Sequence, residues 1–453
     1  MVRPAATDGG VLLEIGERLL AYAEAEGASG AEVVAWLEDA ALTRFANSEI
    51  HQNVAESGVH VSLRFVDGRR QGVASTDRLD EAALRRLAET AGRIAAVSAE
   101  RDDGVALPEP TPIHEVAEAL ATATAEASPD LRAEGTRAVI AAADAAGVVA
   151  YGSFATTVET LAVANSRGVR AEGTRSWAQL LTVMMGPGGG TGYAEAAAVD
   201  VRAIDAAAIG REAADRARAS RDPIAIEAGE YPVVLESYAV SDIAENLGFL
   251  GFSALAVEEG RSFAEPGRRI GSDLVSIWDD GTDPGCLPMP FDFEGVPKQR
   301  VSLVDHGVCR DVVYDAQTAA RAGRLSTGHG LPAPNTYGPV PMNIVMAPGA
   351  TPRADLIAGM DRGLLVTRFH YTNPVHPKLA IVTGMTRDGT FLVEGGRVVA
   401  PVRNLRFTQS YLDALAGVEA VSAERRLVRG NVGGMLVPAV RIAAWTFTGT
   451  TEH

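Results

Sequence analysis

Two stretches of alternating apolar and polar residues constrain the fold of this chain more than any other feature. Residues 31–52, AEVVAWLEDAALTRFANSEIHQ, and residues 59–76, VHVSLRFVDGRRQGVAST, change character with a period of two, which is typical of half-buried β-strands. Asp67 and Gly68 interrupt the second stretch and suit a tight hairpin turn. The sequence therefore predicts an antiparallel sheet near the N-terminus.

Helical patterns flank these strands on both sides. Residues 11–26 repeat leucine and isoleucine at helical spacing, and residues 80–98 do so behind an aspartate that suits an N-cap. A segment of about 99–115 then carries three prolines and no periodicity. We expect this segment to be an extended linker on the surface.

The same order of elements recurs after the linker. A helix is predicted over 129–146, strands over 147–185 and a helix over 203–219. This order fits either a degenerate internal duplication or two ordinary α+β layers in one sheet. The glycine run GPGGGTG at 186–192 lacks the Lys-Ser/Thr that closes a phosphate-binding loop, so it predicts a flexible hairpin or mobile lid.

A second domain is predicted from the change in composition near Tyr231. YPVVLES forms a strand, a helix follows, and short strands alternate with turns beyond about residue 273. The predicted fold class is α+β. An N-terminal domain of antiparallel sheet with packed helices spans 1–221, and a β-rich C-terminal domain spans 222–453, with the boundary at 222–232.

Charge and cysteine content limit the possible partners and compartment. The 453 residues include 41 basic and 58 acidic ones, and the net charge of -17 disfavours binding to nucleic acid or anionic membrane. The first residues lack the order of a signal peptide, and no apolar run reaches membrane-spanning length. With only two cysteines, no disulfide framework is expected, and the prediction is a cytoplasmic protein with reduced thiols.

The histidines give little support for a metal site encoded by local spacing. None of the eight is three, four or five residues from another, so no helical ligand pair exists. His370 and His376 come nearest, but prolines in that segment exclude a helix, and they are only weak metal candidates. Convergence with distant residues such as His306 or Cys309 remains open.

The segment LESYAVSDIAENLGF, residues 235–249, is the main candidate for acid–base chemistry. Asp242 and Glu245 share one helical face, where paired carboxylates can act as general acid and base. The same acids also suit a helix start or a solvated face, and we prefer this interpretation. Glu236 is assigned to the strand end.

Nucleophilic catalysis by serine or cysteine has little support. The chain lacks a Gly-x-Ser-x-Gly elbow, and Cys309 lies in a strand pattern where a small buried residue is the ordinary role. Asp305 and His306 are expected to form a turn with Gly307.

Three longer segments resemble the TldD/TldE (PmbA) metallopeptidase family. RFANSEIHQNVAESGVHVSLRFVDGRRQGVASTDRLDEAALRRL at 44–87 resembles its N-terminal signature of strand, hairpin and helix. FDFEGVPKQRVSLVDHGVCRDVVYDAQTAARAG at 291–323 is similar to its middle segment. VTGMTRDGTFLVEGGRVVAPVRNLRFTQS at 382–410 resembles its C-terminal signature. The three segments occur in the family's order over nearly the whole chain.

The resemblance implies a two-domain subunit that dimerises around an enclosed cavity. TldD-type subunits of the family carry a zinc-binding His-Glu-x-x-x-His helix after a VVL strand and a cysteine ligand near the C-terminus; TldE-type subunits lack both. Here SDIAENLGFL at 241–250 has no histidine, and the tail at 429–447 has no cysteine. The resemblance therefore implies a TldE-type chain without its own catalytic residues or metal, paired with a TldD-type catalytic subunit that holds the zinc.

The implied role of this chain is to complete the cavity and hold an extended peptide or a peptide-like amide. Strand addition at a sheet edge would serve this purpose. The candidate substrate-binding residues are Arg368, Phe369, His370, Tyr371, Thr386, Arg387, Asp388 and Tyr337. In the alternative interpretation, the aromatic rings pack in the core and the arginines solvate a rim.

Two other functions remain open. The chain could be a self-sufficient metal-dependent hydrolase that acts on a small amide conjugate through Asp242, Glu245, His370 or His376. It could also be a scaffold or binding homodimer without a peptidase partner. The sequence does not distinguish general proteolysis, leader removal and a biosynthetic step.

Overall fold

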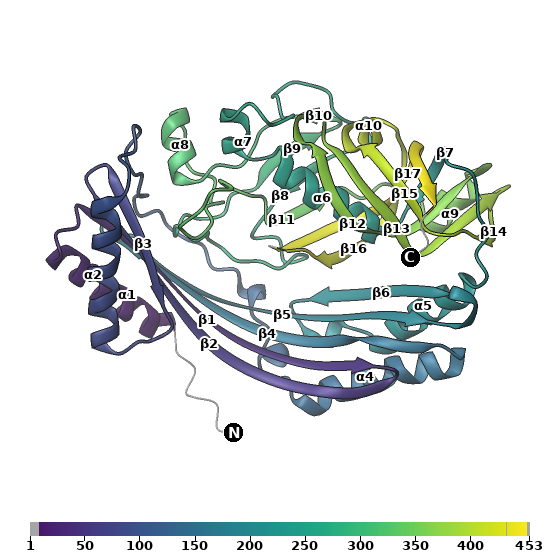
Figure 1. The fold of residues 1–453 in the computed structure, drawn as a ribbon, viewed down its shortest axis with the longest axis horizontal. Helices are drawn as coiled ribbons and strands as arrows, with labels where there is room; N and C mark the ends of the chain where they lie inside the picture. The colour runs from purple at the N-terminus through teal and green to yellow at the C-terminus, as the bar shows by residue number, and fades with distance from the viewer. Residues whose placement is uncertain (1–8, 432, 451–453) are drawn as a thin grey trace.

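The protein consists of two β-sheets of different design, each with its own helices (Figure 1). The computed structural model describes residues 9–431 and 433–450. The predicted α+β fold class is confirmed. No helix in this described part is long and apolar enough to cross a membrane.

The first sheet is antiparallel and has the strand order β3-β2-β1-β4-β5-β6. Its strands are β1 (Gly30–Ala46), β2 (Glu49–Asp67), β3 (Arg70–Thr76), β4 (Val149–Asn165), β5 (Arg170–Met185) and β6 (Thr191–Ala198). Strands β1 and β4 pair at the centre, so that two three-stranded meanders lie side by side in one continuous sheet. The predicted repeat of helix, strands and helix is confirmed as an order of elements, whereas its origin by duplication remains a prediction.

Helices cover one face of this sheet, and the C-terminal domain covers the other (Figure 1). The helices are α1 (Gly9–Ala25), α2 (Glu81–Val97), α3 (Thr122–Ala125), α4 (Pro129–Ala146) and α5 (Ala206–Ala219), with 3-10 turns at Ala117–Ala119, Pro187–Gly189 and Val201–Ala203. Asp80, Ser128 and Asp205 cap α2, α4 and α5 with their side chains. The glycine run forms the β5–β6 hairpin, closed by the Gly186 N–H on the Gly190 carbonyl.

The second sheet follows the order β10-β9-β8-β11-β17-β15-β13-β12-β7. Its strands are β7 (Gly229–Leu235), β8 (Ile277–Asp279), β9 (Val301–Asp305), β10 (Val308–Cys309), β11 (Asn343–Met346), β12 (Arg362–His376), β13 (Ile381–Glu394), β14 (Arg397–Pro401), β15 (Leu405–Ser410), β16 (Val418–Arg429) and β17 (Gly434–Thr450). Its helices are α6 (Ser237–Leu250), α7 (Ala254–Glu258), α8 (Ala316–Ala322), α9 (Arg353–Ala358) and α10 (Tyr411–Ala416), with a 3-10 turn at Pro377–Leu379.

Strand β17 also pairs with β7, which closes β7, β12, β13, β15 and β17 into a ring. The main hydrophobic core of the domain lies against this ring and includes Trp445, which is fully buried and stacks on Phe369. Cys309 is buried on β10, as the sequence predicts. His306 and Gly307 form the β9–β10 turn with positive φ, whereas Asp305 is the last residue of β9.

The predicted division at residue 221 falls between α5 and β7, and it remains a prediction as a boundary of folding units. The predicted linker also contacts the second domain, because the Asp103 carboxylate lies 2.8 Å from the Arg321 guanidinium of α8. Met289 and Phe291 of the second domain pack against Val34 and Leu161 of the first sheet. The two sheets are therefore held together by apolar as well as charged contacts.

Candidate functional site

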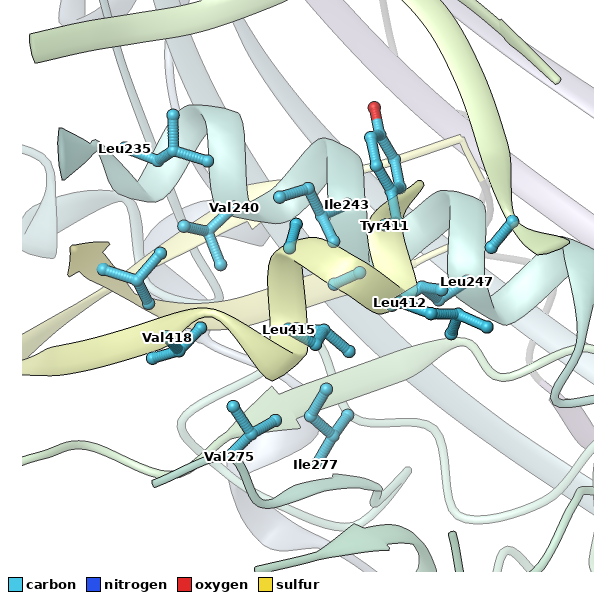
Figure 2. Packing of buried hydrophobic residues seen from close by; sticks show 14 of the residues in the cluster. Leu235, Val240, Ile243, Leu247, Val275, Ile277, Tyr411, Leu412, Leu415 and Val418 are labelled. Atoms are coloured by element: carbon cyan, nitrogen blue, oxygen red, sulfur yellow. The ribbon is translucent and has the colours of Figure 1, made fainter. Parts of the chain in front are cut away.

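Helix α6 is mostly enclosed in the core of the second domain. It begins directly after the VVL strand β7, and Val240, Ile243 and Leu247 repeat at helical spacing on its apolar side. Figure 2 shows these side chains beside Leu412 and Leu415 of α10. The packing fixes the rotation of α6 and thereby the direction of its polar side chains.

Asp242 lies in the second turn of α6 and is half-buried. Its Oδ1 accepts the Tyr411 hydroxyl at 2.8 Å and the Asn246 amide at 3.2 Å, and its Oδ2 accepts the Thr372 hydroxyl at 2.7 Å. Desolvation raises the pKa of Asp242 to about 6, with a smaller contribution from the charge of Glu245, although the three hydrogen bonds oppose this rise. The expectation of a helix-end, solvated acid is wrong for Asp242, because three elements of the fold converge on it.

Glu245 is half-buried one turn later on the same helix. Its Oε1 accepts the backbone N–H of Asn431 at 2.6 Å, which ties α6 to the connection between β16 and β17. Both acids of the candidate pair are therefore engaged by the chain itself. Glu236 lies one residue beyond the end of β7, at the N-cap position of α6, and its buried carboxylate pairs with Arg353.

Replacing Asp242 with asparagine is expected to make stability less dependent on pH. A carboxyl group whose folded pKa exceeds its unfolded value stabilises the protein fully below about pH 4, and this contribution is lost as the pH rises through about 6. Relative to wild type, Asp242→Asn should therefore gain about 1–2 kcal/mol between pH 5 and pH 8, after allowance for partial exposure. The amide can still accept from Tyr411 and donate to Thr372.

Urea unfolding of both proteins at pH 5 and pH 8 measures this gain. Asp413→Asn, on the exposed side of α10, is the matched control. A stability difference between Asp242→Asn and wild type that stays constant across this pH range would contradict the assignment.

Two of the predicted substrate-binding residues belong to the core. Phe369 is 5% exposed and packs against Phe407 and Trp445. Thr386 is fully buried and bonds Thr390 and the Leu405 backbone N–H. Their assignment to substrate binding is wrong, because the alternating strand pattern directs these side chains inward.

Three of the other candidates, Arg368, Arg387 and Asp388, lie near an irregularity in the pairing of β12 with β13. Arg368 donates to Asp388 at 2.7 Å, and its guanidinium lies 4.4 Å from the ring centre of Tyr193 in the first sheet. Asp388 is buried and has a positive φ of 56°, so it supports Arg368 and presents no free carboxylate. Arg387 is half-buried on β13 opposite Arg368, and its guanidinium forms no hydrogen bond or ion pair within residues 9–431 and 433–450.

The remaining candidates are exposed. His370 and Tyr371 lie on the outer part of β12, and Tyr371 is 75% exposed. His376 caps the 3-10 turn that follows β12. Six residues of strand separate the two histidines by roughly 20 Å, so they do not share one ion. Tyr337 is 67% exposed on the loop before β11, and no contact of the described residues links it to the irregular part of the β12–β13 pair.

A second polar cluster, which the sequence did not predict, lies where the second domain contacts strand β6. The Tyr238 hydroxyl accepts the Glu195 N–H at 3.0 Å, and Arg426 donates to the Glu195 carbonyl at 2.9 Å and to Glu212 at 2.9 Å. Side chains thus satisfy the edge of β6 where another strand would pair. The contributing residues are far apart in the chain, and no local pattern marks them.

Beyond Val366, the outer edge of β12 has no strand partner within residues 9–431 and 433–450. Strand β7 pairs with β12 only at Leu364–Val366, whereas β13 follows β12 to His376 on the other side. Along one edge, residues 367–376 therefore have no strand partner within the described part of the chain, and all of them except Pro374 carry a backbone N–H as well as a C=O group. Such an edge can accept an extended peptide as an additional strand.

The donor set at α6 does not fit zinc. Zinc sites in proteins use imidazole, thiolate and carboxylate ligands that converge on one point. No cluster of three or more His, Cys, Asp or Glu side chains with metal-binding geometry occurs in the described ranges. Asp242 and Glu245 are already hydrogen-bonded, and Cys286 and Cys309 are buried elsewhere.

Fold and sequence together define the class of protein. Three family models match in order: PmbA/TldA metallopeptidase domain 1 at residues 41–95, the central domain at 107–221 and the C-terminal domain at 228–449. These are the three domains of a metallopeptidase family, and in this chain they are arranged as two sheets. The chain belongs to the PmbA/TldD metallopeptidase family.

Curated relatives carry the same family name. The chain is 26% identical over 269 residues to a metalloprotease TldD homolog of Haemophilus influenzae, with 55% of this chain and 54% of that protein covered. It is 24% identical over 211 residues to a zinc metalloprotease TldD homolog of Saccharolobus solfataricus, covering 44% and 45%. The matched region thus spans about half the length of these relatives.

Solved structures show the same fold. TldE from Thermococcus kodakarensis superposes with a TM-score of 0.88 at 21% identity, covering 96% of this chain and 100% of that chain. A putative modulator of a DNA gyrase from Thermotoga maritima gives a TM-score of 0.84 at 20% identity, covering 96% and 100%. At these identities the likeness concerns the fold alone.

Proposed function

We propose that this chain is the non-metal-binding, TldE-type subunit of a heterodimeric zinc peptidase. In this proposal a TldD-type subunit supplies zinc and the catalytic groups. This chain completes the cavity and holds an extended peptide or peptide-like amide. The complex is expected to act in the cytoplasm.

The position of α6 and the chemistry of its side chains are the main support for this proposal. The helix occupies the place after the VVL strand where the resemblance implies a metal helix, and it offers Asp242 and Glu245 without any imidazole. Both carboxylates bind groups of this chain and are held in place by them. A helix with this chemistry serves better as a structural element than as a metal site.

The outer part of β12 is the proposed holding element. Its unpaired edge can hydrogen-bond an extended chain without regard to side-chain identity. Arg387 lies on β13 opposite Arg368 of β12, and its guanidinium has no partner within the described residues, so it can contact a carboxylate or carbonyl of the bound chain. His370 and Tyr371 provide exposed contacts along the same edge.

Reconstitution tests the proposal. The purified chain should bind less than stoichiometric zinc and cleave no peptide, because it lacks nitrogen and sulfur ligands that converge. Mixing it with its cognate TldD-type subunit should give a stable complex whose peptide hydrolysis is abolished by a chelator. Metal content is measured by elemental analysis, complex formation by size-exclusion chromatography and hydrolysis with an unstructured peptide.

Other outcomes would assign the chain differently. Robust hydrolysis by the isolated chain that is lost in His370→Ala would identify a self-sufficient hydrolase. Co-purification from the native host that yields a homodimer and no His-Glu-x-x-x-His subunit would identify a scaffold or binding protein. Either result would overturn the heterodimer proposal.

A further inference from the structure

A row of charged and aromatic side chains crosses the face of the first sheet that is turned toward the second domain. Strand register places Glu38 opposite Glu159 and Glu159 opposite Arg175. Trp177 follows two residues later on β5 and therefore shares this face. Arg175 and Glu159 form an ion pair at 2.7 Å, with side chains 19% and 14% exposed.

Arg429 of the second domain rests on this row. It ends β16, and the centre of its guanidinium lies 3.9 Å from the ring centre of Trp177. Such stacking holds the planar guanidinium in one orientation and leaves its N–H groups free at the edges. The next residues, Gly430 and Asn431, form the connection that Glu245 of α6 binds. Arg429 therefore lies beside the segment that contacts the candidate helix.

The charge of Arg429 is only partly compensated. Its guanidinium forms no ion pair or hydrogen bond with any group in residues 9–431 and 433–450, although it is half-buried. Desolvation and the nearby charge of Arg175 lower the pKa of Arg429, while the charges of Glu159, Glu38 and Glu195 act in the opposite direction. A half-buried cation without a hydrogen-bonded anion is costly, and an incoming anion would remove that cost.

We propose that Arg429, stacked on Trp177, binds the free carboxylate of the substrate peptide. This inference rests on the proposed function and names the part of the substrate that the chain recognises. The carboxylate accepts two N–H groups of the guanidinium in bidentate geometry. A peptide with a free C-terminus is therefore preferred over the same peptide with a C-terminal amide.

The charges around Arg429 favour a monoanion. Arg175 is paired with Glu159, so of the two guanidinium groups only that of Arg429 lacks an ion-pair partner within the described residues. The nearby carboxylates of Glu38 and Glu195 repel a dianion more strongly than a monoanion. A carboxylate matches this balance, whereas a phosphate dianion does not.

Binding of a matched peptide pair to the isolated chain and to the reconstituted complex tests the inference. The probes are an N-acetylated pentapeptide of alanine and leucine with a free carboxylate, its C-terminal amide, and inorganic phosphate. Isothermal titration calorimetry should show tighter binding of the acid than of the amide. Arg429→Gln should weaken binding of the acid by roughly 10- to 100-fold and leave binding of the amide nearly unchanged.

Two further variants separate this effect from general loss of charge or folding. Arg429→Lys keeps the charge but loses the planar fork, so it should give an intermediate affinity for the acid. Arg425→Gln removes an exposed charge from the same strand and should leave both affinities unchanged. Circular dichroism confirms that each variant is folded.

The outcomes distinguish this inference from the proposed function. Equal binding of acid and amide, an acid preference that survives in Arg429→Gln, or tighter binding of phosphate overturns the inference, even if the complex still hydrolyses peptide. Selective binding of the acid by a chain that forms no complex supports the carboxylate site and rejects the heterodimer.

Discussion

Arg64→Met is expected to lower the free energy of unfolding by about 3–5 kcal/mol, because it leaves buried carboxylates without their cation. Arg64 on β2 donates to Glu32 of β1 at 2.8 Å and lies 3.7 Å from Glu294 of the second domain. All three side chains are buried. Urea unfolding at pH 8 measures the loss.

The pH dependence and a double variant identify the cause of this loss. Burial already raises the pKa of Glu32 and that of Glu294, so both carboxyls protonate more readily when the cation is removed. The deficit of Arg64→Met should therefore narrow toward pH 5. Adding Glu32→Met should recover part of the stability, whereas Arg86→Met on the exposed side of α2 should cost little. A deficit below about 1 kcal/mol at pH 8 would contradict the role of Arg64.

Asp279→Ala is expected to cost about 3–5 kcal/mol, because it leaves several buried donors unsatisfied. Oδ1 of Asp279 lies 2.7 Å from Nε2 of His329, and Oδ2 accepts the backbone N–H groups of Met342 and Asn343 at 2.6 and 2.7 Å. Asp279 and His329 are both fully buried. Thermal and urea unfolding measure the loss.

Asp279→Asn is an informative companion because it preserves shape. An amide can present one oxygen acceptor, but its NH2 group would face either His329 or the two backbone N–H donors. The asparagine variant should therefore remain clearly destabilised. Glu89→Ala, an exposed acid on α2, controls for loss of negative charge. Full stability of Asp279→Asn would show that the negative charge and the second acceptor contribute nothing.

Local patterns were sufficient for most elements of the first sheet and its helices. The helix predicted at 129–146 coincides with α4, and that at 80–98 differs from α2 by one residue at each end. These elements are marked by amphipathic periodicity and capping side chains, which act over a few residues. The closed ring of the second sheet was beyond this reasoning, because β7 and β17 pair across some two hundred residues of chain.

In the candidate site, too, sequence reasoning found what local patterns encode and missed what contacts between distant segments decide. Sequence reasoning found α6, Arg368 and Arg387, and it placed Phe369 and Thr386 wrongly, because a strand pattern with bulges does not reveal which face is buried. It missed Tyr238, Arg426 and Arg429 altogether. Their partners lie on the other domain, and such contacts leave no signal in the spacing of one sequence.

The sequence by itself determined the α+β class, the order of helices and strands, the family resemblance and the absence of histidine from α6. These properties depend on residue type and short-range spacing, which a linear chain displays directly. Only the tertiary structure decided that Asp242 meets Tyr411 and Thr372, that Glu245 holds the β16–β17 connection, and that Arg429 stacks on Trp177. Burial and hydrogen bonding between distant segments create these environments, and the charge and pKa of each side chain follow from them.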